Sequence, residues 1–252
     1  MKRFTGLMAL LLAVLLTGCS TTTDPDTAND PAEGFNRGVY AFNEELDTYV
    51  LKPASEGWTR VTTSGMRRGV DNFFNNLQAP GYILNDALQG KGVGAGRQSV
   101  RFVVNTTIGL LGIFDPAEAW LGLEPRPEDF GQTLGVWGAE SGPYLVLPLF
   151  GPSNGRDVTQ YPVAYYTNVM TYVALDTLTM GSLTAVNIVN TRARAEGAAR
   201  LRDESAVDPY VFTRSAYRQY REDQINDGNA SLEDDAYSDF FEEMETPGDQ
   251  VE

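Results

Sequence analysis

The sequence contains no histidine and only one cysteine, Cys19, in 252 residues. Ser-His-Asp and Cys-His catalysis, and most zinc and haem sites, need imidazole groups or several thiolates. None of these sites can be built from this chain alone, and a single cysteine cannot form an internal disulfide.

Basic residues are also scarce, with 19 Lys and Arg against 34 Asp and Glu and a formal net charge of −15. Proteins that bind nucleic acid draw much of their affinity from Lys and Arg that neutralise phosphates, so nucleic acid is not an expected partner. The excess negative charge is concentrated at one end, because residues 222–252 hold 12 acidic and no basic groups. Residues 223–252 are predicted to form a disordered acidic tail.

No apolar run reaches the roughly 20 residues that are needed to span a membrane as a helix. Residues 7–16 are all apolar, follow Lys2 and Arg3, and precede the small residues Thr17 and Gly18. This pattern is typical of a cleaved export signal over residues 1–18.

The residues 16–19 (LTGC) resemble the bacterial lipobox, in which the cysteine is acylated and becomes the mature N-terminus. We therefore predict lipidation of Cys19, which would hold the chain on a bilayer. A signal anchor with an incidental cysteine is the alternative. Ser20 stands where an Asp would resemble the inner-membrane retention signal, so the resemblance points to the outer membrane of a diderm bacterium.

The mature chain divides into a polar segment and a long helical part. Residues 19–32 are rich in Thr, Asp, Asn and Pro, and are predicted to be a lipidated flexible tether. Over residues 33–222 apolar residues recur mostly at steps of three and four, which predicts an all-α domain. The helices that we expect cover residues 35–51, stopping at Pro53, then 70–80, 83–90 after Pro80-Gly81, 99–113 after a Gly-rich turn at 90–96, and 192–222.

Two segments do not fit long amphipathic helices. In residues 114–157 Gly and Pro recur too often, so we expect a compact region of short helices and turns. Residues 158–190 contain Asp176 as their only charge, whereas a soluble surface helix normally has a charged face. This uncharged segment is either enclosed by the rest of the chain or in contact with lipid.

Several motifs resemble the MlaA (VacJ) family of outer-membrane lipoproteins. The opening motif is DPAEGFNR at residues 30–37, and the central signature is EDFGQTLG at 128–135 with WG at 137–138. The signature continues as GPYLVLP at 142–148, GPS at 151–153 and RD at 156–157. The candidates for a lipid path or a structural signature within these motifs are Phe35, Asn36, Phe42, Phe130, Gly131, Gly135, Trp137, Pro143, Tyr144, Pro148, Arg156 and Asp157.

This resemblance implies a compact, ring-like helical lipoprotein that lies in the periplasmic leaflet of the outer membrane and has an amphipathic channel. It also implies retrograde transport, in which mislocalised phospholipids are drawn from the outer leaflet and passed to a periplasmic lipid-binding shuttle. Members of the family associate with trimeric porins. The resemblance implies no catalytic residue and no cofactor or metal, so we expect a protein that is not an enzyme. We keep two other functions open: a structural lipoprotein that scaffolds porins, and a lipid hydrolase, which the absence of a Gly-x-Ser-x-Gly elbow disfavours.

The sequence allows two interpretations of some residues. Gly131, Gly135 and Gly138 either allow close packing around the ring or supply positive φ in turns, and turn geometry is the favoured role. Arg156-Asp157 is either a buried ion pair, which we favour, or a head-group contact. The stripe of Arg214, Arg218 and Arg221 is either a solvated face, which we favour, or a contact to anionic lipid or an acidic partner. The aromatic stripe of Phe35, Phe42 and Tyr49 has a core role or faces lipid.

Overall fold

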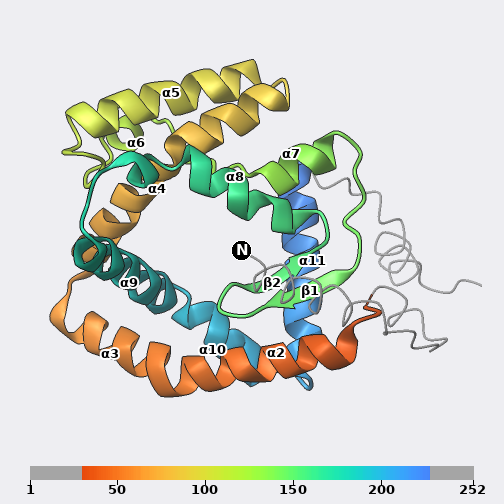
Figure 1. Cartoon of the computed structure of the whole chain (residues 1–252). Coiled ribbons are helices and arrows are strands. Elements are labelled where there is room, and N and C mark those ends of the chain that lie inside the picture. Colours follow the sequence, from red (N-terminus) through yellow and green to blue (C-terminus); the bar gives the residue numbers. More distant parts are fainter. Residues whose placement is uncertain (1–29, 228–252) are drawn as a thin grey trace, which may run out of the picture.

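The computed structural model describes residues 30–227. The predicted signal peptide, Cys19 and the tail from residue 228 lie outside the described residues. Within them the chain is helical apart from one short hairpin, which confirms the all-α prediction for the fold as a whole. Figure 1 shows the elements arranged as a ring around an opening, with the hairpin inside the ring.

The elements follow the chain around this ring. The α-helices are α2 (Glu33–Leu46), α3 (Lys52–Val61), α4 (Ser64–Leu88), α5 (Gly92–Thr107), α6 (Pro116–Leu121), α7 (Phe130–Val136), α8 (Gln160–Thr167), α9 (Thr177–Arg194), α10 (Glu196–Ser205) and α11 (Pro209–Ile225). Short π and 3-10 segments are η1 (Asp47–Leu51), η2 (Asp157–Thr159) and η3 (Val169–Tyr172). Helix α4 packs along α5, α3 packs against α9, and α11 packs against α7.

Two prolines do not end helices as predicted. The π-helical segment η1 joins α2 to α3, and Pro53 lies in the first turn of α3, where a missing N–H costs little. Pro80 lies inside α4, a single 25-residue helix where we expected two. Packing of α4 along α5 offsets the cost of the N–H that Pro80 lacks. The expected Gly-rich turn is also shorter, because α5 already begins at Gly92.

The hairpin is the element that the sequence pattern did not predict. Strand β1 (Tyr144–Leu147) pairs antiparallel with β2 (Gly151–Asn154), with Tyr144 opposite Asn154. Its turn contains two residues with positive φ, Leu149 at 70° and Gly151 at 79°. Strands of four residues between Gly and Pro give almost no periodicity, which is why turns alone were expected here.

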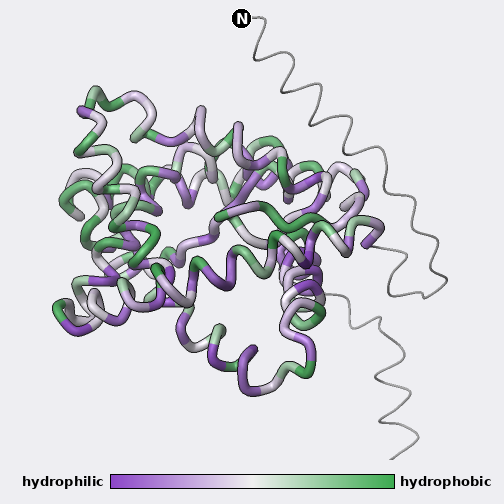
Figure 2. Tube along the Cα trace, turned by 60° about the horizontal axis from the view of Figure 1, so that its bottom comes forward, coloured by the Kyte–Doolittle hydropathy of each residue, from purple (hydrophilic) through white to green (hydrophobic). Residues whose placement is uncertain are grey.

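The described residues have little apolar core. Between residues 30 and 227 only six hydrophobic residues are buried, whereas nineteen buried residues are polar or charged. Hydrophobic and hydrophilic residues alternate along most of the trace (Figure 2). No helix between residues 30 and 227 is both long enough and apolar enough to cross a membrane.

Candidate functional site

Two asparagines of α2 attach this helix to the hairpin. Asn36 is fully buried; its Nδ2 donates to the Tyr144 carbonyl at 2.9 Å and its Oδ1 accepts from the Val146 N–H at 2.9 Å. Asn43 lies two turns further along α2, where its Nδ2 donates to the Leu147 carbonyl at 3.0 Å. Both side chains therefore replace the strand that the outer edge of β1 lacks.

Asp30 connects the start of the described chain to α11. It is 2% exposed although it lies in the segment expected to be a tether. Its carboxylate accepts from the Asn36 Nδ2 at 2.7 Å, from the Arg214 Nη1 at 3.1 Å and from the Tyr210 hydroxyl. Helices α2 and α11, from the two ends of the domain, are thus joined through one buried carboxylate.

Asp157 is the centre of a second buried network. This fully buried carboxylate accepts from the Arg221 Nε at 2.8 Å, the Tyr217 hydroxyl at 2.7 Å, the Asn154 Nδ2 at 2.7 Å and the Arg156 Nε at 2.9 Å. Burial alone would raise the pKa of Asp157, but the hydrogen bonds from its donors outweigh burial and lower this pKa below its ordinary value of 3.8. The geometry supports the favoured interpretation of Arg156-Asp157 as a buried ion pair.

Arg221 extends this network to α7. Its Nη2 donates to the Asp129 Oδ1 at 3.0 Å. Asp129 also caps α7, because its Oδ1 accepts from the Gln132 N–H at 2.9 Å. One arginine therefore fixes the start of α7 and the segment after the hairpin to the same helix, α11.

Gly131 and Gly135 lie in α7, where the chain packs too closely for a side chain. A Cβ on Gly131 would lie 2.5 Å from the Asp157 Oδ1, and a Cβ on Gly135 would lie 2.8 Å from the Ile225 Cδ1. Neither glycine has positive φ, so the turn role that we favoured is wrong for these two. It is right for Gly138, which has φ +88°.

Two arginines of α11, Arg214 and Arg221, are buried where a solvated face was predicted. Arg214 and Arg221 are buried and paired with Asp30, Asp129 and Asp157, so the solvated face that we favoured is wrong for both. The signal that could have located their partners was the Asp residues within the family motifs. Asp30 and Asp129 stand in those motifs but were not singled out as site residues.

The other candidates lie at the surface or at the edge of the networks. Phe35, Phe42 and Tyr49 are 58%, 54% and 75% exposed, so this stripe is not core. Phe130 packs edge-on against Trp137, whose Nε1 donates to the Leu88 carbonyl at 3.0 Å. Pro143 and Pro148 are exposed on either side of β1, whereas Tyr144 within it is 2% exposed.

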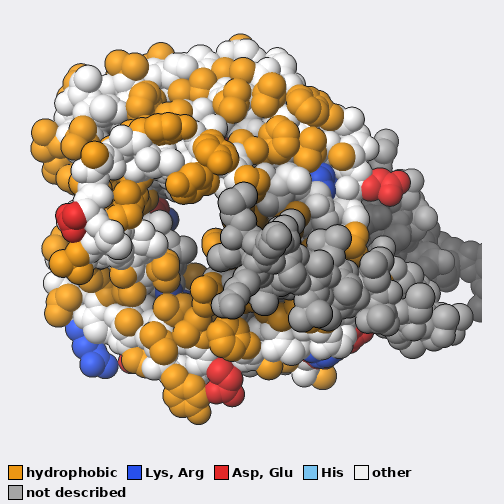
Figure 3. Space-filling model, in the orientation of Figure 1, with side chains coloured by type: hydrophobic (Ala, Val, Ile, Leu, Met, Phe, Trp, Pro, Cys, Tyr) orange, Lys and Arg blue, Asp and Glu red, His pale blue; other side chains and the backbone are white. Residues whose placement is uncertain are grey.

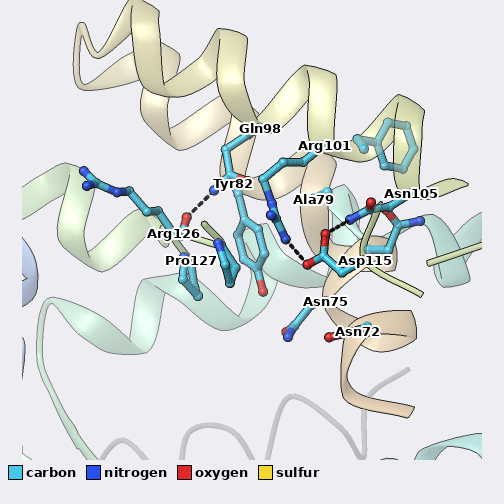
Figure 4. A pocket seen from close by; sticks show the side chains of 13 residues that line it. Asn72, Asn75, Ala79, Tyr82, Gln98, Arg101, Asn105, Asp115, Arg126 and Pro127 are labelled. Atoms are coloured by element: carbon cyan, nitrogen blue, oxygen red, sulfur yellow. Dashed lines mark hydrogen bonds and ion pairs between the residues drawn. The ribbon is translucent and has the colours of Figure 1, made fainter. Parts of the chain in front are cut away.

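A third polar cluster joins α5 to α6 on another part of the ring (Figure 4). The Arg101 Nη2 donates to the Asp115 Oδ2 at 2.6 Å, and the Asn105 Nδ2 donates to the Asp115 Oδ1 at 2.9 Å. The cavity beside them measures only about 40 Å³, which is space for water rather than for a lipid. We therefore assign this cluster to the support of the ring.

The centre of the ring is open. Figure 3 shows an opening with hydrophobic side chains along its rim and over the visible surface. The tip of the hairpin borders this opening in Figure 1, and its residues Leu149 and Phe150 are 69% and 66% exposed. The opening thus combines apolar side chains with a frame held together by buried polar groups.

The uncharged segment at residues 158–190 is not enclosed by the described chain. Its large side chains Tyr166, Tyr172 and Leu178 are 67%, 71% and 80% exposed. Of the two expectations for this segment, the exposure favours contact with lipid.

Comparison with known proteins places the chain in a family. Residues 28–224 match the model of the MlaA lipoprotein family. The chain is 35% identical over 235 residues to the intermembrane phospholipid transport system lipoprotein MlaA of Haemophilus influenzae. The aligned region covers 90% of this chain and 93% of that relative.

The protein of the same name from Escherichia coli is 35% identical over 230 residues, covering 88% of this chain and 89% of the relative. A solved structure, described as the structural basis for maintenance of bacterial outer membrane lipid asymmetry, matches with a TM-score of 0.69 at 31% identity and covers 78% of this chain and 99% of that chain. The chain therefore belongs to the MlaA lipoprotein family.

Proposed function

We propose that this protein is an outer-membrane lipoprotein that removes mislocalised phospholipids from the outer leaflet and so maintains lipid asymmetry. The phospholipid passes through the opening of the ring and is handed to a periplasmic lipid-binding shuttle protein. Cys19 anchors the chain in the periplasmic leaflet. The names of the relatives from Haemophilus influenzae and Escherichia coli, intermembrane phospholipid transport system lipoproteins, support transport of this class of molecule.

The proposal rests on one observation: around an opening, the polarity of buried and exposed side chains is the reverse of that in a soluble protein. Buried side chains are mostly polar, whereas large apolar side chains such as Phe35, Tyr172 and Leu178 are exposed. Monomeric soluble proteins rarely expose contiguous apolar patches beyond a few hundred Å². A ring with an apolar exterior is suited to lie among acyl chains, and its opening is then the one route for polar groups.

The chemistry of this route is physical rather than catalytic. A phospholipid that crosses hydrocarbon unaided must bury a charged head group, which is costly without partners. An opening that offers polar groups and water to the head group, and apolar side chains to the tails, lowers this cost without breaking any bond. The proposed function accordingly uses no acid, base, metal or cofactor.

Two protein partners complete the proposal: a trimeric porin in the outer membrane and the soluble shuttle in the periplasm. Porin association would hold the ring at a fixed depth, and the shuttle would accept the lipid as it leaves the opening. The resemblance described above is the support for both partners. Structural scaffolding of porins without lipid movement is the competing function.

The test is the amount of phospholipid in the outer leaflet of a deletion strain, with and without the restored gene. We expect surface phospholipid to rise on deletion and to return to its original amount on restoration, together with sensitivity to detergent and chelators. If deletion leaves surface phospholipid unchanged but impairs porin assembly, the protein is a porin scaffold and not a lipid transporter. Mass spectrometry of the purified protein tests the anchor, and an intact signal with a free Cys19 thiol would refute it.

A further inference from the structure

A second cavity of about 430 Å³, with several charged side chains in its lining, lies at the outer edge of the ring. It is open to solvent and is lined by the connection between α4 and α5, the segment 122–128, and Asp227 at the end of α11. Figure 1 places the α4–α5 connection on the outside of the ring, away from the opening. None of the networks described above uses this cavity.

The N-terminus of α5 faces the cavity without a cap. This 16-residue helix begins at Gly92, and its N-cap residue Lys91 makes no side-chain capping hydrogen bond. The N–H groups of Val93 and Gly94, which line the cavity, have no acceptor among residues 30–227. Unpaired N–H groups at the start of a helix attract anions, phosphate above all.

Asp86 provides a second and independent feature of the same cavity. It is 3% exposed, and its Oδ2 is buried without a hydrogen-bond partner in the described chain. Burial, followed by the nearby charge of Glu128, raises the pKa of Asp86 to about 6. A buried carboxylate oxygen without a donor is destabilising, so a ligand that brings a donor would relieve this cost.

The remaining charges of the cavity are balanced. The Lys91 Nζ forms ion pairs with the Glu128 Oε1 at 3.1 Å and with the Asp227 Oδ1 at 2.5 Å. Four charged residues of the lining make no ion pair within residues 30–227: Asp86, Glu124, Arg97 and Arg126. Two carboxylates and two guanidinium groups of the lining thus make no ion pair with the described chain. They match a ligand that carries one charge of each sign.

We propose that this cavity binds an alkylammonium phosphate, the chemistry of the head group of phosphatidylethanolamine, as a fixed lipid site outside the transport route. The phosphate oxygens accept from the N–H groups of Val93 and Gly94, with Arg97 and Arg126 beside them. The ammonium group donates to the Asp86 Oδ2. Inorganic phosphate would leave Asp86 without a donor, and a glycerol head group would bring no positive charge to it.

The glycines of α5 offer a matched pair of variants. A Cβ on Gly94 would lie 2.6 Å from the Asp86 Oδ1, whereas a Cβ on Gly92 would meet nothing within 4 Å. Gly94→Ala therefore places a methyl group in the space between the N-terminus of α5 and the Asp86 carboxylate. Gly92→Ala leaves this space free. Asp86→Asn keeps the shape and removes the charge that the ammonium needs.

The experiment measures lipids retained by the full lipidated protein in nanodiscs of equal phosphatidylethanolamine and phosphatidylglycerol, after extraction and native mass spectrometry. We expect retained phosphatidylethanolamine to exceed phosphatidylglycerol about ten-fold, the ratio that corresponds to one charge-assisted hydrogen bond. Asp86→Asn and Gly94→Ala should abolish this preference, and Gly92→Ala should keep it. Thermal unfolding of each variant confirms that the fold is retained, and Asp86→Asn is the informative variant if Gly94→Ala unfolds.

Soluble competitors distinguish the sources of the head group. O-phosphoethanolamine should displace the retained lipid, and inorganic phosphate should do so at least ten-fold less well. Equal retention of the two lipids, equal competition by inorganic phosphate, or an unchanged preference in Asp86→Asn would overturn the proposal. Binding of soluble O-phosphoethanolamine without retention of phosphatidylethanolamine would overturn the lipid assignment.

Discussion

Arg221 donates from Nε to the Oδ2 of Asp157 at 2.8 Å and from Nη2 to the Oδ1 of Asp129 at 3.0 Å. This one side chain joins α11 to the N-terminus of α7 and to the residues that follow the hairpin. Because α11 is also attached to Asp30 through Arg214, the ring closes through ion pairs at the helix that completes it. These ion pairs act beside a small apolar cluster, in which Tyr210 of α11 packs with Tyr144 and Val146 of β1.

We expect Arg221→Leu to destabilise the protein by about 3–5 kcal/mol, because it leaves two carboxylates without their buried partner. Chemical unfolding in mild detergent measures this change. Arg60→Gln is the matched control, since Arg60 is exposed and 3.7 Å from Glu56, and surface pairs contribute about 0–1 kcal/mol. Equal stability of Arg221→Leu and Arg60→Gln would contradict a role for Arg221 in closing the ring.

Asp157 should make stability depend on acid pH. Its pKa in the folded state is below that in the unfolded state, so its contribution is complete above about pH 4 and is lost as pH falls through the folded pKa. Wild type should therefore exceed Asp157→Asn in unfolding midpoint at pH 7, and the difference should shrink below about pH 4. A difference that stays constant from pH 7 to pH 3 would show that Asp157 does not act through its charge.

Substitution of Gly135 should disrupt the contact of α7 with α11. Gly135→Trp is expected to abolish phospholipid transport and leave lipidation and membrane location intact, because a Cβ here already meets Ile225 and Arg156. Gly181→Ala is the control, since a Cβ on Gly181 meets nothing within 4 Å. Transport is measured as surface phospholipid, and the thermal midpoint separates a misplaced α7 from an unfolded protein. Full transport by Gly135→Trp would refute the need for this contact.

The domain should remain attached to lipid without its acyl anchor. Cys19→Ser protein lacking the signal peptide is expected to float with vesicles and to have a helical circular dichroism spectrum. Leu178→Asp should weaken flotation without lowering the thermal midpoint, because Leu178 is 80% exposed in the uncharged segment. Thr59→Asp, an exposed position between Glu56 and Arg60, should float like the parent. A monodisperse monomer in plain buffer would contradict the lipid contact.

The sequence predicted what depends on local pattern and missed what depends on contacts between distant segments. The periodicity of Phe35 and Phe42 is enough to identify α2, but their exposure is a property of the assembled ring. The arginine stripe of α11 suggested a face exposed to solvent, because the carboxylate partners of Arg221, Asp157 and Asp129, lie 64 and 92 residues away in the chain. Pro80 shows the same limit, since a proline that ends an isolated helix is accommodated when α5 packs alongside.

In the proposed function, phospholipid passes through the opening bordered by the tip of the hairpin. Cys19 is the only natural cysteine and is predicted to be acylated, so Leu149→Cys adds one free thiol at this tip. Val103→Cys places the control thiol on α5, where the residue is 58% exposed. The decisive measurement is outer-leaflet phospholipid in cells with each variant, before and after reaction with a maleimide that enters the periplasm. We expect surface phospholipid to rise only in labelled Leu149→Cys cells. Equal transport after complete labelling of both variants would refute passage through the opening.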